Sequence, residues 1–81
     1  MERAERRGLA RLMLRHPEHR EAFRRRAEAD ANFRELCEAY EAACGVVEYW
    51  ARSNDMVAPD RTSEYHALAA AVEEDILREA M

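Results

Sequence analysis

The sequence predicts an all-α protein: an antiparallel helical hairpin with one or two extra N-terminal helices. Two observations carry this prediction. The 81 residues contain only two glycines and two prolines, and they are rich in the helix formers alanine, glutamate and arginine. Two segments with helical spacing of apolar residues, at about 33–50 and 65–77, flank a short stretch of turn residues. A chain of this length forms one domain, residues 1–81.

Residues 1–16 form a basic amphipathic helix in this prediction. One helical face carries four residues at the spacing i, i+3, i+4 and i+7: Leu9, Leu12, Met13 and His16. Pro17 ends the helix, because the residue before a proline is pushed away from helical dihedrals. Gly8 weakens a helix by about 1 kcal/mol relative to alanine, so we expect the first two turns to fray.

Residues 17–54 hold the second helix and the long first arm of the hairpin. The second helix covers about residues 17–29 and has little apolar surface of its own. Asp30 or Asn32 then caps the third helix, or the two helices fuse. The first arm has the best pattern in the chain, with a 3, 4, 3, 4, 3 spacing typical of heptads: Phe33, Leu36, Tyr40, Ala43, Val47 and Trp50.

The second arm covers residues 62–81. Residues 53–60 form the loop before it, and Asp60, Thr62 or Ser63 caps its first turn. Its expected inner face is a row of four residues, Tyr65, Leu68, Val72 and Ile76, which Leu77 and Met81 widen. A loop of this length between two heptad-patterned helices favours antiparallel packing.

Charge is divided unevenly along the chain. Residues 1–27 hold nine arginines and four acids, whereas residues 28–81 hold four arginines and thirteen acids, for net charges of +5 and −9. The simplest consequence is attraction between the basic third and the acidic arms. The alternative is that the basic third binds nucleic acid or an anionic surface. Seven residues are candidates for that contact: Arg7, Arg11, Arg15, Arg20, Arg24, Arg25 and Arg26.

Burial in so short a chain is modest, and this favours assembly. The burial of about a dozen large apolar side chains has to offset the conformational entropy that some eighty residues lose on folding, which is roughly 1.5 kcal/mol per residue. We therefore expect a homo-oligomer, with a dimer favoured, and a small non-enzymatic protein that acts as a protein–protein interaction or accessory module. The candidate partner-binding residues are Leu9, Leu12, Met13, Phe23 and Trp50.

No catalytic, cofactor or metal site is predicted. Cys37 and Cys44 lie about 10.5 Å apart along one helix, too far for a disulfide between them. His16 and His19 are separated by the expected helix break at Pro17 and have no further ligand nearby in sequence. No apolar run approaches the ~20 residues of a transmembrane helix and no signal-peptide core is present, so the expected location is the cytoplasm.

Short motifs in residues 16–81 suggest a family. His16-Pro17-Glu18, followed by the run of residues 30–40 with Asp30, Phe33, Leu36 and Tyr40 at "D-x-x-F-x-x-L-x-x-x-Y" spacing, resembles the small bacterial YdcH-like proteins. The acidic residues 73–75 followed by Ile76-Leu77 are similar to the end of their second arm. The resemblance implies a two-helix hairpin of uncharacterised role with no catalytic residues to transfer. This chain departs from it by its basic first helix and by lacking a lysine-rich last arm.

Overall fold

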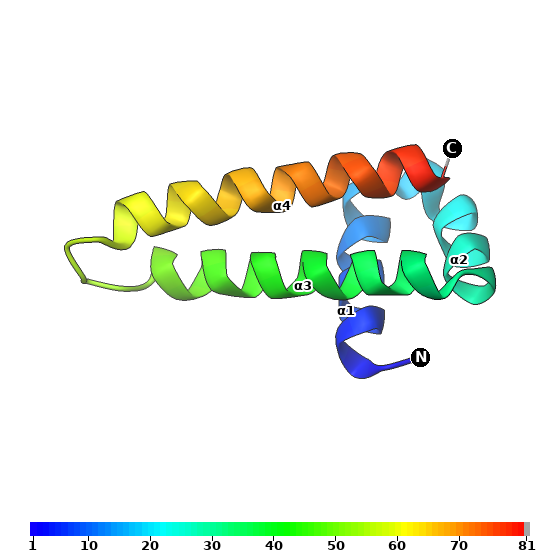
Figure 1. Cartoon of the computed structure of the whole chain (residues 1–81), viewed down its shortest axis with the longest axis horizontal. Coiled ribbons are helices and arrows are strands. Elements are labelled where there is room, and N and C mark those ends of the chain that lie inside the picture. Colours follow the sequence, from blue (N-terminus) through cyan, green and yellow to red (C-terminus); the bar gives the residue numbers. More distant parts are fainter. Residues whose placement is uncertain (81) are drawn as a thin grey trace.

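Helices account for almost all of residues 1–80, the part of the chain that this computed structural model describes. The elements are α1 (Arg3–Arg15), a 3-10 turn (Pro17–His19), α2 (Arg20–Ala29), α3 (Ala31–Ala51) and α4 (Ala58–Ala80). Helices α3 and α4 form the antiparallel hairpin, α2 lies across the end opposite the loop, and α1 crosses one face of the hairpin (Figure 1). The predicted fold class is confirmed. Met81, where the expected second arm ends, lies outside the described residues.

Two local signals break the N-terminal half into separate helices. At the first, His16 has φ −128° and ψ 67°, and α1 ends before Pro17 as expected. At the second, Asp30 is extended, and its carboxylate accepts hydrogen bonds from the N–H groups of Asn32 and Phe33 at 2.9 and 3.4 Å. Helices α2 and α3 are therefore distinct, and Asp30 rather than Asn32 is the N-cap of α3.

The loop is shorter than the sequence suggested. Helix α4 begins at Ala58, not near residue 62, because the turn is closed by Asp55. The Asp55 carboxylate accepts a hydrogen bond from the Val57 N–H at 3.0 Å, and its carbonyl accepts one from the Ala58 N–H at 3.0 Å. Pro59 fits the first turn of α4 because backbone N–H groups there have no helical acceptor. The expected caps at Asp60, Thr62 and Ser63 are therefore wrong.

The core lies where α1 and α2 meet the hairpin. Ten buried residues form it: Leu9, Leu12, Phe23, Ala27, Phe33, Cys37, Tyr40, Ala43, Ala69 and Ile76. The expected inner face of α4 is only partly correct. Ile76 is fully buried, but Leu68 is 49% exposed, while the smaller Ala69 points inward instead. The row therefore faces the core at Val72 and Ile76 but turns away from α3 at Leu68.

Gly8 marks the point where α1 crosses α3. A Cβ atom on Gly8 would lie 1.9 Å from the carbonyl oxygen of Cys37, so the two backbones approach too closely for any other residue. The first turns of α1 are also held, since the Glu2 N–H donates a hydrogen bond to the Glu5 carboxylate at 2.8 Å. This capping contact opposes fraying, and the expectation that the first two turns of α1 fray stays a prediction.

Candidate functional site

The five predicted partner-binding residues do not form one surface. Leu9, Leu12 and Phe23 are at most 7% exposed and belong to the core of the chain itself. Met13 packs against that core, and Trp50 is half-buried near the far end of α3. The apolar face of α1 was identified correctly, but it is covered by the chain's own hairpin rather than left for a partner.

Ion pairs fasten α1 to α3. The Arg11 guanidinium donates hydrogen bonds to the carboxylates of Glu41, at 2.5 Å, and Glu48, at 2.6 Å. Arg7 adds a second contact to Glu41 at 3.2 Å. The hydrogen bond to Glu41 raises the pKa of Arg11 further above its ordinary value, and the hydrogen bond from Arg11 lowers the pKa of Glu48. The basic face of α1 is thus neutralised within the chain.

The end of α1 is held to α4 in the same way. Arg15 and His16 both contact one oxygen of Glu73, at 2.6 and 2.7 Å. In α2, Arg26 contacts Glu79 at 3.0 Å and Asp30 at 3.1 Å. Four of the seven arginines expected to bind an anion are therefore already paired with carboxylates. Of the remaining three, Arg24 makes a long contact of 3.8 Å with Glu21, while Arg20 and Arg25 are exposed and make no ion pair with any described residue.

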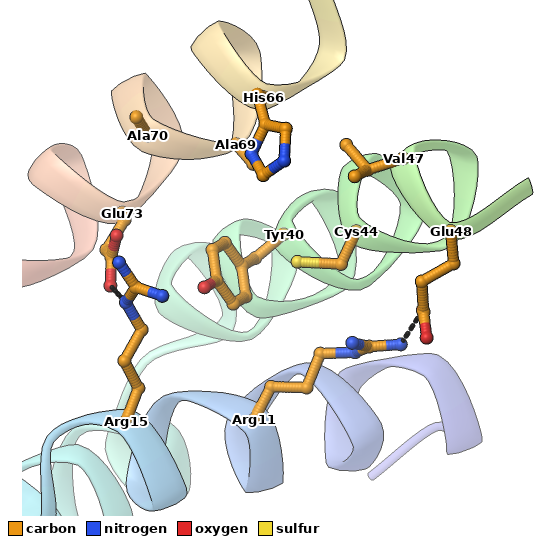
Figure 2. Close-up of a pocket in the computed structure, with 10 residues that line it drawn as sticks. All are labelled: Arg11, Arg15, Tyr40, Cys44, Val47, Glu48, His66, Ala69, Ala70 and Glu73. Carbon is orange, nitrogen blue, oxygen red and sulfur yellow. Dashed lines mark hydrogen bonds and ion pairs between the residues drawn. The ribbon is translucent and has the colours of Figure 1, made fainter. Parts of the chain in front are cut away.

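A groove of about 250 Å³ lies in the corner between α1, α3 and α4. Figure 2 shows Arg11 and Arg15 reaching up from α1 while Tyr40 and Cys44 of α3 and His66 of α4 border the same space. Both arginines turn to carboxylates of the hairpin and so are not free to hold an anion in the groove. Ala69 and Ala70 line the groove on its α4 side.

The two cysteines are free thiols in unlike surroundings. Burial raises the pKa of the Cys37 thiol to about 12. Burial also raises the pKa of Cys44, which borders the groove, although a hydrogen bond with Tyr40 partly offsets the shift. A raised pKa keeps a thiol protonated near neutral pH, and the thiolate is the nucleophilic form. The groove therefore offers no activated sulfur nucleophile.

Exposure should make the two thiols react at different rates. With a disulfide reagent at pH 8, we expect Cys44 to react at least about tenfold faster than Cys37, because Cys37 becomes accessible only when α1 lifts from α3. The variant Cys44→Ser should retain only the slow phase. A single phase that accounts for both thiols in the wild type would contradict the packing of α1 over Cys37.

Histidines do not gather into a metal site. The rings of His16 and His19 lie 6.1 Å apart between centroids, and both pack against the buried ring of Phe23. Among residues 1–80, no three histidine, cysteine, aspartate or glutamate side chains are placed to share a metal ion. His16 instead contacts Glu73, as part of the link between α1 and α4.

The hairpin has a second face that no helix covers. The positions of α3 that meet α1 are Cys37, Glu41 and Glu48, and those of α4 include Glu73. In Figure 1, α1 passes behind the two arms, and the near face of the hairpin is uncovered. By helical periodicity this near face, the open face below, carries eight residues: Leu36, Ala39, Ala43, Val46 and Trp50 of α3, and Tyr65, Leu68 and Val72 of α4.

The open face is partly accessible to solvent. Leu68 and Ala39 are exposed, and Val46, Trp50 and Tyr65 are half-buried. Leu36 and Val72 border the face and pack against the core, to which Ala43 belongs. On α3 the spacing is 3, 4, 3, 4, and on α4 it is 3, 4, which is the heptad pattern of helices that pack against other helices. Sequence reasoning assigned six of these positions, all but Ala39 and Val46, to the heptad rows inside the hairpin. Burial agrees with that assignment for Leu36, Ala43 and Val72, but Leu68 is exposed, since one heptad row cannot tell an inner from an outer contact.

Comparison with protein-family models, curated proteins and solved structures gives no match for this chain. The resemblance to YdcH-like proteins therefore stays a prediction. No helix within residues 1–80 combines the length and the apolar character needed to span a membrane.

Proposed function

We propose that this chain is a non-enzymatic protein–protein interaction module that acts, and self-associates, through the open face of its hairpin. The observation that carries the proposal is a group of apolar side chains on the open face that are exposed or half-buried: Ala39, Val46 and Trp50 of α3, and Tyr65 and Leu68 of α4. Contiguous exposed apolar surface is unusual on a small monomer and is typical of a site that contacts another protein. A half-buried tryptophan within it, Trp50, is the residue type most enriched at interface centres.

The alternative of anion binding through the N-terminal third has less support. Arg7, Arg11, Arg15 and Arg26 would have to exchange carboxylates at about 3 Å for phosphates. Of the seven candidate arginines, Arg20, Arg24 and Arg25 are left without a close carboxylate partner among the described residues, and Glu18 and Glu21 lie near them in the sequence. A binding face for a polyanion needs a broader excess of positive charge.

We further propose that the module works in a reducing compartment such as the cytoplasm, and that it is related to the YdcH-like hairpins. Free Cys37 and Cys44 support the first of these, because secreted small domains usually use their cysteines in disulfides. The hairpin of α3 and α4 supports the second, because the resemblance implies that shape.

Substitution of Leu68 by glutamate tests the proposed surface. The wild type should sediment as a dimer at high concentration, and Leu68→Glu should be monomeric over roughly 1 μM to 1 mM, since a charge at the centre of an apolar interface loses its hydration. The measurement is analytical ultracentrifugation, with circular dichroism to establish that helix content is unchanged.

Leu14→Glu is the matched control. Leu14 is 78% exposed, more than Leu68, but it lies on the outer side of α1. It should leave the dimer unchanged. If Leu14→Glu dissociates the dimer and Leu68→Glu does not, the interaction surface is α1 and the proposal is wrong.

A further inference from the structure

The open face of α4 continues beyond its apolar residues into a charge at each end. Arg61, Tyr65, Leu68, Val72 and Asp75 follow one another at spacings of 4, 3, 4 and 3, so all five lie on one side of the helix. Leu68 is the midpoint of this row. Arg61 stands seven residues before it and Asp75 seven residues after it, with opposite charges.

A similar row with its own midpoint runs along α3. Leu36 and Trp50 lie seven residues on either side of Ala43, with Ala39 and Val46 between them, and none of the five is charged. The two midpoints lie at the same height of the hairpin. Tyr40 and Cys44 border one groove together with His66, Ala69 and Ala70, which sets residues near 43 opposite residues near 68.

We infer that the open face binds a second copy of this chain in antiparallel orientation, with a two-fold axis that passes close to Leu68 and Ala43. The inference rests on the proposed function and names its partner. A two-fold axis of this kind pairs each residue of α4 with the residue equally far on the other side of Leu68. Leu68 then meets Leu68 of the second copy, and each Arg61 meets Asp75 of the second copy.

Side-chain sizes on α3 agree with the same axis. Leu36 of one copy meets Trp50 of the other at both ends, while the small, exposed Ala39 allows the two α3 helices to approach near the middle, where Ala43 is buried within its own copy. Alternation of large and small side chains across facing helices gives close packing. The result is a bundle of four helices, made of two hairpins stacked face to face, with the two α1 helices on its outer faces.

Charge disfavours the parallel alternative, in which the two loops lie together. The segment 48–64, which contains the loop, holds four acids and two arginines, so two such segments would repel each other. The antiparallel arrangement separates them and adds two pairs between opposite charges. Within its own helix, Arg61 already pairs with Glu64, and Asp75 pairs with Arg78. In the dimer, each contact between Arg61 and Asp75 of the second copy would join these pairs into a small ion-pair network.

The area is sufficient for a modest dimer. Helix α3 has 21 residues, a length of about 31 Å, and two adjacent helices are about 20 Å wide, so the flat face measures roughly 600 Å² per copy. This is somewhat less than the ~800 Å² per partner of a standard interface. A reversible dimer, rather than an obligate one, is expected.

Cross-linking at position 68 tests the register. In Leu68→Cys the new thiols of the two copies would lie near the axis, within the ~7 Å between Cα atoms that a disulfide allows, so mild oxidation should convert most of the protein to a covalent dimer. Ala70→Cys, also exposed on α4 but turned toward the groove, is the matched control and should cross-link no more than the wild type.

Charge reversal gives an independent readout of affinity by sedimentation. Arg61→Glu and Asp75→Arg should each weaken the dimer about tenfold, since each replaces two attractive contacts by repulsive ones, and the double variant should return to within about threefold of the wild type. Arg52→Glu, a like change outside the row, should have no effect. A dimer in which Leu68→Cys does not cross-link, or whose affinity the double variant does not restore, overturns the register while the proposed function stands. A wild type that is monomeric up to 1 mM overturns both.

Discussion

Replacing Gly8 with alanine should destabilise the fold by about 1–3 kcal/mol, the usual cost of overpacking a core. The expectation opposes helix propensity, by which the same change in an isolated helix is favourable by about 1 kcal/mol. The steric term decides the sign because the new Cβ would meet the carbonyl oxygen of Cys37 at 1.9 Å and its carbonyl carbon at 2.7 Å. Both are backbone atoms that no side-chain rotation can move, so α1 has to shift away from α3. Urea denaturation followed by circular dichroism measures the change.

Gly45 offers a control within the same molecule. It also lies inside a helix, α3, but a Cβ there would have no neighbour within 4 Å. Gly45→Ala should therefore follow propensity and stabilise the protein by about 0.5–1 kcal/mol. If both alanine variants are stabilised, α1 does not cross α3 as closely as described.

Truncating Phe23 to alanine should cost about 3–5 kcal/mol, as for other buried aromatic residues. The Phe23 ring is fully buried and packs 6.2 Å from the ring of Phe33 and 6.1 Å from that of His16, between centroids. The expected loss is comparable with the whole stability of a domain of this size, roughly 4–12 kcal/mol. Thermal unfolding of Phe23→Ala should thus begin well below that of the wild type, and α2 should lose its anchor.

The control is Leu14→Ala, which removes a similar apolar side chain from an exposed site of α1 and should change stability by less than about 0.5 kcal/mol. The pair also decides between two roles for Phe23. A variant with the stability of the wild type and weakened self-association would return Phe23 to the interaction surface on which the sequence placed it.

Local signals predicted the elements well. The break at Pro17 and the cap at Asp30 act through the dihedrals and hydrogen bonds of adjacent residues, so the sequence contains all that determines them. The start of α4 was misplaced because several cap-forming residues, Asp55 among them, lie close together, and their competition is settled by the closing of the hairpin.

Contacts between distant segments were not predictable in the same way. The amphipathic pattern of α1 shows that Leu9 and Leu12 are covered but not by what, so it cannot separate the chain's own hairpin from a partner. A glycine lowers helix propensity at any position in a helix. Whether the fold requires glycine at position 8 depends on where α1 crosses α3, which the local sequence does not show. The pairing of α1 with Glu41 and Glu48 did have a signal, since an arginine row faces an acidic row on a neighbouring helix.

The off-centre position of α1 gives the hairpin an uneven distribution of local stability. Between Ala43 and Ala69 only Ala58 is buried, so the half of the hairpin next to the loop has little tertiary support beyond the contact between its own two arms. Such a region opens in small fluctuations that leave the rest folded, whereas the end held by α1 and α2 opens only with the whole molecule. The molecule thus combines a cooperative base with an adaptable end, and a partner that orders this end would be bound at an entropic cost.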